Sequence, residues 1–393
     1  MPPRTFHQTS AGDLSTPPGT YIYTLAPLSA THLAASTSSS SSLVTFSRST
    51  LTPTTTIPHA HTNITSLSAY PASPQTLLTS GTDGLLKLWD LRCSPPAAEA
   101  SKINVGAPVL CTSADAQGRI IAGTEMRDRV SRVCVWDGRM AGEKPTWVFT
   151  ESHGDDVSFV GFAGGEEGGR WGVSGGMDGL VSVFDLLAGE GAEGRDDDEK
   201  ALWQVVNIGS SVHRAGFLNA GGGGGAAGKG EWVFGVSTDE SLVLRSFNHT
   251  PGREEDAAGE VAGDVGDVRK RLDCEYVVDV LRLSGTGTGG IIVAGNKEVG
   301  KQRIDLVPLR WAGSHWGFAG EDKVRLQGGH GEEVCRGVWV DDDSETVFTS
   351  GEDGLVRVWK EETSRGEGLS EGKKEKRARK GEGKREKKRF KAY

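Results

Sequence analysis

Short stretches of alternating apolar and polar residues, separated by glycine-containing turns, recur along the chain. Three of them align with one another: 77–90 reads LLTSGTDGLLKLWD, 172–185 reads GVSGGMDGLVSVFD and 347–360 reads VFTSGEDGLVRVWK. In each, an Asp-Gly pair comes before an aromatic residue. Alternation with a period of two predicts β-strands, and Asp-Gly favours a tight turn that tolerates positive φ. Each block therefore predicts two strands joined by a hairpin.

The aligned blocks belong to a longer repeat. A histidine lies upstream of each block, and a further strand with alternating apolar positions follows it. Weaker copies of the same pattern occupy 105–137, 232–247 and 276–309. An N-terminal unit, YIYTLAPLSATHLAAST followed by SLVTFS, has three plausible strands without Asp-Gly or Trp-Asp. These copies make seven units in all, which predicts a repeat architecture.

The repeat resembles the WD-repeat family, with its Gly-His start and Trp-Asp end. The resemblance implies four strands per unit and an all-β fold, a seven-bladed WD-repeat β-propeller. Closing the ring hides the sheet edges, and we expect residues near Thr5 to Ser10 to close the last blade after Trp359. Within the family, the order of motifs is similar to that of the WD repeat-containing protein 89 group and its fungal members.

We expect the propeller to span residues 1–363 and to be followed by a disordered, Lys/Arg-rich tail at 364–393. Segments near 187–200, 219–230 and 250–268 are low in complexity. They are rich in Gly, Glu and Asp and include a five-glycine run. Because such compositions cannot bury enough apolar surface to order themselves, they predict solvated loops between strands.

The resemblance also implies a buried hydrogen-bonded set in each strong repeat, made of a His, a Ser or Thr, the turn Asp and an aromatic residue. A His-Ser-Asp trio on its own would fit a hydrolase, but an enzyme needs one site rather than three. We therefore expect these sets to be structural and the protein to be no enzyme, with no cofactor, bound metal or small-molecule substrate. The residues are His61, Thr79, Asp83 and Trp89; His153, Ser174, Asp178 and Phe184; and His330, Thr349, Asp353 and Trp359.

Composition and cysteine usage limit the cellular compartments in which we expect the protein. The chain is 36% hydrophobic and 25% charged, within the globular range. It has no apolar run of membrane-spanning length, and its first residues lack the apolar stretch of a secretory signal. The five cysteines are scattered without a C-x-x-C pair, which indicates reduced thiols in a cytosolic or nuclear protein.

Charge is distributed unevenly behind the net value of -9. Residues 372–393 hold 12 Lys or Arg and 3 Glu, so this part of the tail carries +9 and residues 1–371 carry -18. An acidic body attracts basic protein segments when its acids gather on one face.

Two runs in the tail satisfy the loose criterion for nuclear import or for salt-sensitive, sequence-independent RNA contact. We expect a location in the nucleus, including the nucleolus, with the cytoplasm as the alternative. A merely solubilising tail, or one that folds back onto the acidic body, are the other interpretations. The basic residues concerned are Lys373, Lys374, Lys376, Arg377, Arg379, Lys380, Lys384, Arg385, Lys387, Lys388 and Arg389.

Two early repeats end in Trp-Asp-x-Arg, with Asp90 and Arg92 in the first and Asp137 and Arg139 in the second. The pattern is similar to the motif by which substrate receptors of cullin-RING ubiquitin ligases dock on their adaptor. The simpler interpretation is that each Arg pairs with the nearby Asp of its own blade. The sequence thus predicts a non-enzymatic interaction scaffold, with a ligase substrate receptor as the alternative.

Overall fold

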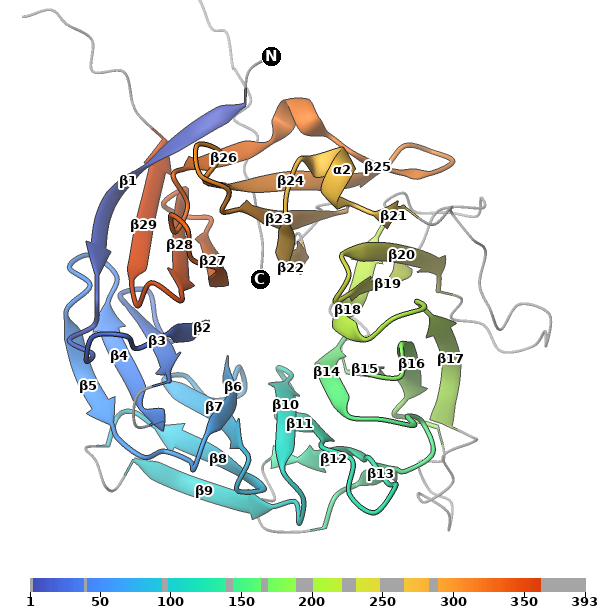
Figure 1. Cartoon of the computed structure of the whole chain (residues 1–393). Helices are drawn as coiled ribbons and strands as arrows, with labels where there is room; N and C mark the ends of the chain where they lie inside the picture. Colours follow the sequence, from blue (N-terminus) through green and yellow to red (C-terminus); the bar gives the residue numbers. More distant parts are fainter. Residues whose placement is uncertain are drawn as a thin grey trace, which may run out of the picture.

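The strands form a closed ring of seven β-sheet blades around a common centre (Figure 1). The computed structural model describes residues 3–38, 41–93, 98–138, 144–163, 169–188, 201–220, 231–247, 265–282 and 289–361. No helix in this described part of the chain is long and apolar enough to cross a membrane.

Blades 1 to 5 are separate four-stranded antiparallel sheets in which consecutive strands pair. Blade 1 has β2 (Ile22–Pro27), β3 (His32–Thr37), β4 (Leu43–Ser47) and β5 (Pro53–Ile57), and blade 2 has β6 (Ile64–Ala69), β7 (Thr76–Gly81), β8 (Leu85–Asp90) and β9 (Glu99–Asn104). Blade 3 has β10 (Val109–Ala114), β11 (Arg119–Thr124), β12 (Val133–Asp137) and β13 (Trp147–Phe149). Blade 4 has β14 (Val157–Phe162), β15 (Trp171–Gly176), β16 (Leu180–Asp185) and β17 (Leu202–Asn207), and blade 5 has β18 (Val212–Asn219), β19 (Glu231–Ser237), β20 (Ser241–Ser246) and β21 (Gly266–Asp267).

Blades 6 and 7 are joined into one nine-stranded sheet. Blade 6 has β22 (Tyr276–Arg282), β23 (Gly290–Asn296), β24 (Arg303–Trp311), β25 (Trp316–Phe318) and β26 (Val324–Gln327), with the short helix α2 (Arg269–Leu272) before it and the 3₁₀ turn η4 (Gly320–Asp322) within it. Blade 7 has β27 (Cys335–Asp341), β28 (Thr346–Gly351), β29 (Val356–Glu361) and, from the start of the chain, β1 (Arg4–Gly12).

The first strand of each blade lies nearest the centre of the ring (Figure 1). Because the strands alternate in direction, the loops that enter a blade and the turn between its second and third strands share one face, which we call the upper face. The turns between first and second strands and between third and fourth strands lie on the lower face. All seven innermost strands shift register near their start, six after the first paired residue, for example between Ile64 and Ser66, and β22 after its second, between Val277 and Asp279. Such bulges increase the local twist of a strand.

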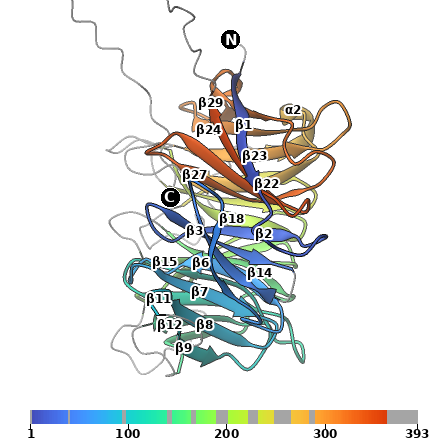
Figure 2. The same cartoon turned by 90° about the vertical axis from the view of Figure 1, so that its left-hand side faces the viewer.

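The ring closes through β1, which pairs antiparallel with β29 and puts Gln8 opposite Trp359. β1 also pairs in parallel with β26, the outer strand of blade 6, so the same strand holds two blades together. Figure 2 shows β1 running beside β29 at the edge of the ring. Phe6, at 4% exposure, packs in the apolar core between blades 6 and 7.

The tight turns follow the Asp-Gly pairs. Gly84, Gly179 and Gly354 have φ values of 74°, 80° and 73°, a conformation that glycine adopts without a Cβ penalty. Blade 5 makes the same turn with Glu240, at φ 67°. Its carboxylate accepts a hydrogen bond from the backbone N–H of Val277 in blade 6 (2.9 Å), which helps to hold the strained conformation.

One expectation about loops is wrong at its edge. The sequence places 250–268 in a solvated loop, but Gly266–Asp267 forms β21, the fourth strand of blade 5, and Val268 is fully buried. Val268 is in the apolar core between blades 5 and 6 and Val265 packs against that core, so apolar side chains anchor both ends of this short strand although the neighbouring composition is polar. Most of the three low-complexity segments, at 189–200, 221–230 and 248–264, lies outside the described residues, as does 362–393.

Closure through β1 predicts a large effect of Phe6→Ala. Removing a buried phenylalanine ring costs roughly 3–5 kcal/mol, so the urea midpoint of unfolding should fall well below that of the unaltered chain. Ser10→Ala, on an exposed position of the same strand, is the control and should change stability by less than about 0.5 kcal/mol. Equal midpoints for the two variants would contradict closure by this strand.

Candidate functional site

Blades 2 and 7 each contain a complete chain of four hydrogen-bonded side chains. In blade 2, Trp89 Nε1 donates to Thr79 Oγ1 (2.8 Å), which lies 2.8 Å from His61 Nε2. His61 Nδ1 lies 2.9 Å from the carboxylate of Asp83. Blade 7 repeats the arrangement, with all three contacts at 2.8 Å, through Trp359, Thr349, His330 and Asp353.

One set of proton positions satisfies every atom in this chain. A neutral histidine with its proton on Nδ1 donates to the Asp, and its Nε2 accepts from the Thr hydroxyl, whose oxygen accepts from the indole. Burial lowers the pKa of His61 and of His330, which keeps both rings neutral. Burial alone would raise the pKa of Asp83, but hydrogen bonds from His61 and from backbone N–H groups bring it below its ordinary value.

Blade 4 has the shorter set that its sequence implies. His153 lies 2.7 Å from Ser174 Oγ and 3.2 Å from Asp178. Phe184 takes the position of the tryptophan, and its ring stacks on Phe149 at a centroid distance of 4.2 Å. Packing between rings therefore replaces the missing indole hydrogen bond.

Blade 3 lacks the hydroxyl. Ala122 occupies the register position of Thr79, two residues along the strand from the partner of the tryptophan. Trp136 is buried, and its Nε1 has no hydrogen-bond partner among the described residues. Leaving a buried donor unsatisfied costs about 1–3 kcal/mol.

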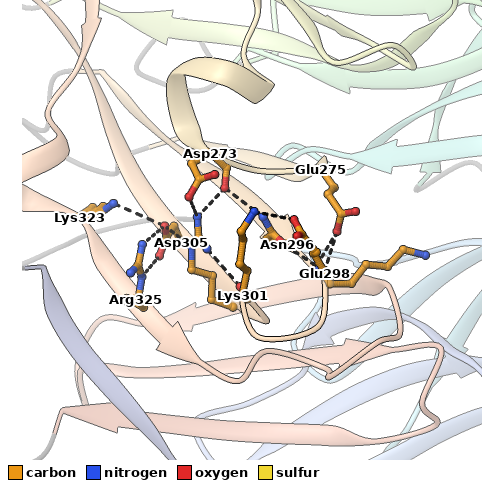
Figure 3. Close-up of polar contacts among 10 residues, drawn as sticks. Asp273, Glu275, Asn296, Glu298, Lys301, Asp305, Lys323 and Arg325 are labelled. Atoms are coloured by element: carbon orange, nitrogen blue, oxygen red, sulfur yellow. Dashed lines mark hydrogen bonds and ion pairs between the residues drawn. The ribbon is translucent and has the colours of Figure 1, made fainter.

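Blade 6 uses ion pairs instead (Figure 3). Asp305, at 2% exposure, accepts hydrogen bonds from Arg325 (2.7 and 2.8 Å) and from Arg303 (3.2 Å). Lys323 lies 3.6 Å away. Burial would raise the pKa of Asp305, but the bonds and charges of these cations lower it. Arg303 also binds Asp273 in the loop that enters the blade, at 2.5 Å.

In blade 6 an acid of the entering loop binds the backbone of the upper turn, between β23 and β24. Glu275, in the loop that enters the blade, accepts hydrogen bonds from the backbone N–H groups of Lys297 (2.7 Å) and Glu298 (3.0 Å) (Figure 3). In blade 2 the turn residue Asp83 does the reverse and accepts from the backbone of the entering loop at Thr62 (3.3 Å). Both arrangements fix the entering loop against the turn.

The His, Ser or Thr and Asp side chains of these sets are hydrogen-bonded to one another inside their own blades. The side chains of all three histidines are fully buried. Burial raises the pKa of the Cys111 and Cys335 thiols and raises that of Cys134 to about 12, so none of these cysteines is an activated nucleophile. The described residues contain no group of three His, Cys, Asp or Glu side chains placed to hold a metal ion.

In the Trp-Asp-x-Arg motif of blade 2, the arginine pairs with the aspartate of the same motif. Arg92 donates to both carboxylate oxygens of Asp90, at 2.8 and 2.6 Å, and this bond holds the pKa of Asp90 down to about 2. The Arg92 side chain is nevertheless 60% exposed on the lower face. Asp137 ends β12 in blade 3, whereas Arg139 and the eleven basic residues between Lys373 and Arg389 lie outside the described residues.

The upper face has an exposed aromatic pair where blades 7 and 1 meet. Tyr21 and Tyr23 flank the start of β2, each 39% exposed, with their rings edge to face at 6.2 Å. The entering loop of blade 7 presents Glu332 and Glu333, both exposed and without a side-chain partner among the described residues. Arg336 forms an ion pair with Glu352 on the adjoining turn.

Backbone contacts bring these two blades together. A Cβ on Gly337 would lie 3.2 Å from the carbonyl oxygen of Tyr23, and one on Gly354 would lie 2.6 Å from that of Thr20. The backbone N–H of Glu352 donates to the carbonyl of Val334 at 3.0 Å, which ties the turn to the acidic loop. The tyrosines and the acids thus border one region of the upper face.

Sequence reasoning missed this region and the ion pairs of blade 6. The YIY alternation gives the signal for the tyrosines, but alternation alone does not distinguish an exposed aromatic from a core one. The acids Glu332 and Glu333 are visible in GGHGEEV, yet only the closed ring brings them to the same region as Tyr21 and Tyr23, more than 300 positions earlier in the chain.

Comparison with known proteins agrees with the repeats. The family profile of the WD domain, G-beta repeat, matches residues 51–90 and 322–360. An uncharacterized WD repeat-containing protein of Schizosaccharomyces pombe is 24% identical over 315 residues, which cover 80% of this chain and 88% of the relative.

Two further relatives match less of their own length. An uncharacterized WD repeat-containing protein of Saccharomyces cerevisiae is 25% identical over 72% of this chain and 64% of the relative. The WD repeat-containing protein GTS1 of Arabidopsis thaliana is 29% identical over 38% of this chain and 35% of the relative. None of the three is named as a WD repeat-containing protein 89, so that finer likeness stays a prediction.

The unsatisfied indole of blade 3 predicts that Ala122→Ser stabilises the protein. A hydroxyl at this position should accept from Trp136 Nε1 and add about 1 kcal/mol to the free energy of unfolding. A double-mutant cycle with Trp136→Phe checks the cause, because the gain should vanish when no indole N–H is present. The same gain in both backgrounds would show that the hydroxyl does not reach the indole.

The buried neutral histidines predict a loss of stability in mild acid. Because the folded-state pKa of His330 is below its ordinary value of about 6.5, its contribution is present above pH 6.5 and is lost as pH falls below it. Urea unfolding between pH 8 and pH 5 should show the difference between the unaltered chain and His330→Gln shrinking as pH falls. A constant difference would contradict a buried neutral ring.

Proposed function

Because this chain belongs to the WD-repeat family, whose members are generally non-enzymatic scaffolds that bind other proteins, we propose that it is an interaction scaffold for basic protein segments. The surface concerned is the region of the upper face where blades 7 and 1 meet. The observation that carries the proposal is that the exposed pair Tyr21 and Tyr23 borders the same region of the upper face as Glu332 and Glu333, two exposed acids with no side-chain partner in the part of the chain that the structure describes.

This combination suits Lys and Arg side chains. A carboxylate pairs with the cationic head, and an aromatic face attracts the same cation with about 0.5–1 kcal/mol at an exposed site. The aliphatic stem covers the apolar part of the ring. Several such contacts along one segment give useful affinity, with an association rate that falls as salt is added.

The acidic character of the body supports this choice of partner. Residues 1–371 carry a net charge of -18, and other carboxylates on the upper face include Asp155 and Asp239. An acidic field around the contact region raises the local concentration of basic segments.

We further propose that the protein acts in the nucleus. The two basic runs of the tail support this location, because clusters of Lys and Arg are the feature that import receptors recognise. The same runs support weak, sequence-independent contact with RNA. Deleting 372–393 and following the location of the protein tests the proposal; unchanged nuclear retention would remove the tail from it.

The alternative is a substrate receptor of a cullin-RING ligase that docks through Arg92 and Arg139. The bidentate bond between Arg92 and Asp90 is what the purely structural interpretation of this motif expects. An adaptor would have to share or break that bond, so the geometry favours the scaffold.

Affinity purification with mass spectrometry separates the two proposals. We expect basic proteins to be recovered with the unaltered chain and to be depleted several-fold by Tyr21→Ala with Tyr23→Ala, and by Glu333→Lys. Glu321→Lys is the matched control, because this exposed acid lies on the lower face and the charge change is the same.

Each opposite result has a clear meaning. Recovery of a cullin adaptor that is lost on Arg92→Ala with Arg139→Ala would make the protein a ligase receptor. Equal loss of basic partners with Glu333→Lys and Glu321→Lys would show attraction by net charge alone and would exclude a specific site on the upper face.

A further inference from the structure

The outer strand of blade 4 forms an open sheet edge. Among the described residues β17 pairs only with β16, and Figure 1 shows it on the outside of the ring. Just past its end, the backbone N–H of Ile208 donates to the carbonyl of Gly179 at 2.9 Å, towards β16. Because successive residues of a strand direct their backbone groups to opposite sides, the N–H and C=O of Val205 and of Asn207 point outward, away from β16.

The other outer strands have features that discourage pairing with another chain. β13 and β21 are only three and two residues long, and β1 is paired on both sides, with β26 and with β29. β5 begins with Pro53. β9 carries the charged residues Glu99 and Lys102. Short strands, proline and charge are devices by which proteins keep sheet edges from joining.

β17 has none of these features. Its six residues read LWQVVN, without proline and without charge. The contrast is clearest at one register position, since Val205 lies opposite Ser182 in blade 4 as Lys102 lies opposite Lys87 in blade 2. The Val205 side chain is 39% exposed. A lysine thus guards the edge of blade 2 at the position where a valine leaves the edge of blade 4 apolar.

We propose that β17 pairs antiparallel with β17 of a second copy of this chain, about a twofold axis at Val205. In this register the N–H and C=O of Val205 in each copy bond to those of Val205 in the other, and the two side chains lie directly opposite one another. Both valines are then covered. Because the strand is neutral, no like charges meet across the axis, so the edge is complementary to itself.

The symmetry of this contact limits the assembly to a dimer. A twofold contact uses the same surface on both copies and is closed, so it leaves no edge for a third chain. Six residues of strand extend only about 20 Å, and a contact of that length buries less surface than a permanent dimer does. We therefore expect a reversible dimer. The contact lies on the perimeter of the ring and does not depend on the surface proposed above for basic segments.

Sedimentation equilibrium of the full chain tests the dimer. We expect the average mass to rise with protein concentration from the 41.7 kDa of one chain towards twice that value. Val205→Lys should weaken association at least tenfold, because it places two lysines opposite one another. Thr56→Lys introduces the same charge at an exposed position of the outer strand of blade 1. This matched control should leave association within twofold.

A pair of variants tests the register itself. Chains with Val205→Lys and chains with Val205→Glu should each remain monomeric at concentrations at which the unaltered chain dimerises. Mixed together, they should form a dimer of one chain of each kind, because opposite charges then face one another across the axis. Circular dichroism checks that both variants are folded, as substitution of an exposed side chain leads us to expect.

Three results would overturn the proposal. The first is an unaltered chain that stays monomeric at every concentration, which would leave the edge of β17 to a different partner. The second is an equal loss of association with Val205→Lys and Thr56→Lys, which would indicate repulsion by net charge. The third is the absence of a mixed dimer, which would exclude pairing about Val205.

Discussion

Everything in this ring depends on the pairing of β1 with β29. A β-sheet blade that lacks its outer strand exposes a row of unpaired backbone groups, and blade 7 has three strands of its own in sequence. The N-terminal strand supplies the fourth and pairs as well with β26. Phe6 of this strand belongs to the core between blades 6 and 7, and the strand bridges the two ends of the chain at the place where blade 7 meets blade 1.

Polar side chains then set how each blade holds its upper loop. Blades 2 and 7 use the chain from tryptophan to aspartate, and blade 6 reaches the same end with the ion pairs around Asp305 and with Glu275. A buried ion pair is weak evidence for stability, because desolvation offsets much of the attraction. Its geometric effect is definite, since Asp305 joins β24 to β26 beside the closing strand. The described buried polar groups of these blades bind one another, whereas the exposed Tyr21, Glu332 and Glu333 lie in or beside loops.

The strong repeats were predictable because their sets are local in sequence: His61, Thr79, Asp83 and Trp89 lie within one unit, and the spacing alone brings them together. The ion pairs of blade 6 were not predictable from the sequence. The three cations that surround Asp305 have no fixed spacing, and ion pairs of this kind leave no periodic pattern. Glu240 shows a second limit, since a left-handed turn is expected at Gly and blade 5 makes it with a glutamate. The tyrosine surface is a property of the assembled ring, in which residues from both chain ends meet.

The joining of Gln8 to Trp359 has a consequence for biosynthesis. At 5–20 residues per second, a ribosome needs roughly 20 to 70 s to make the chain between these partners. Throughout that time β1 has no sheet to join, and blades 1 to 5 can assemble in order while the first strand waits with Phe6 exposed. Ring closure is thus a late, long-range event, of the kind that folds slowly and invites aggregation. The first dozen residues therefore stay without their strand partners until the last blade has been made.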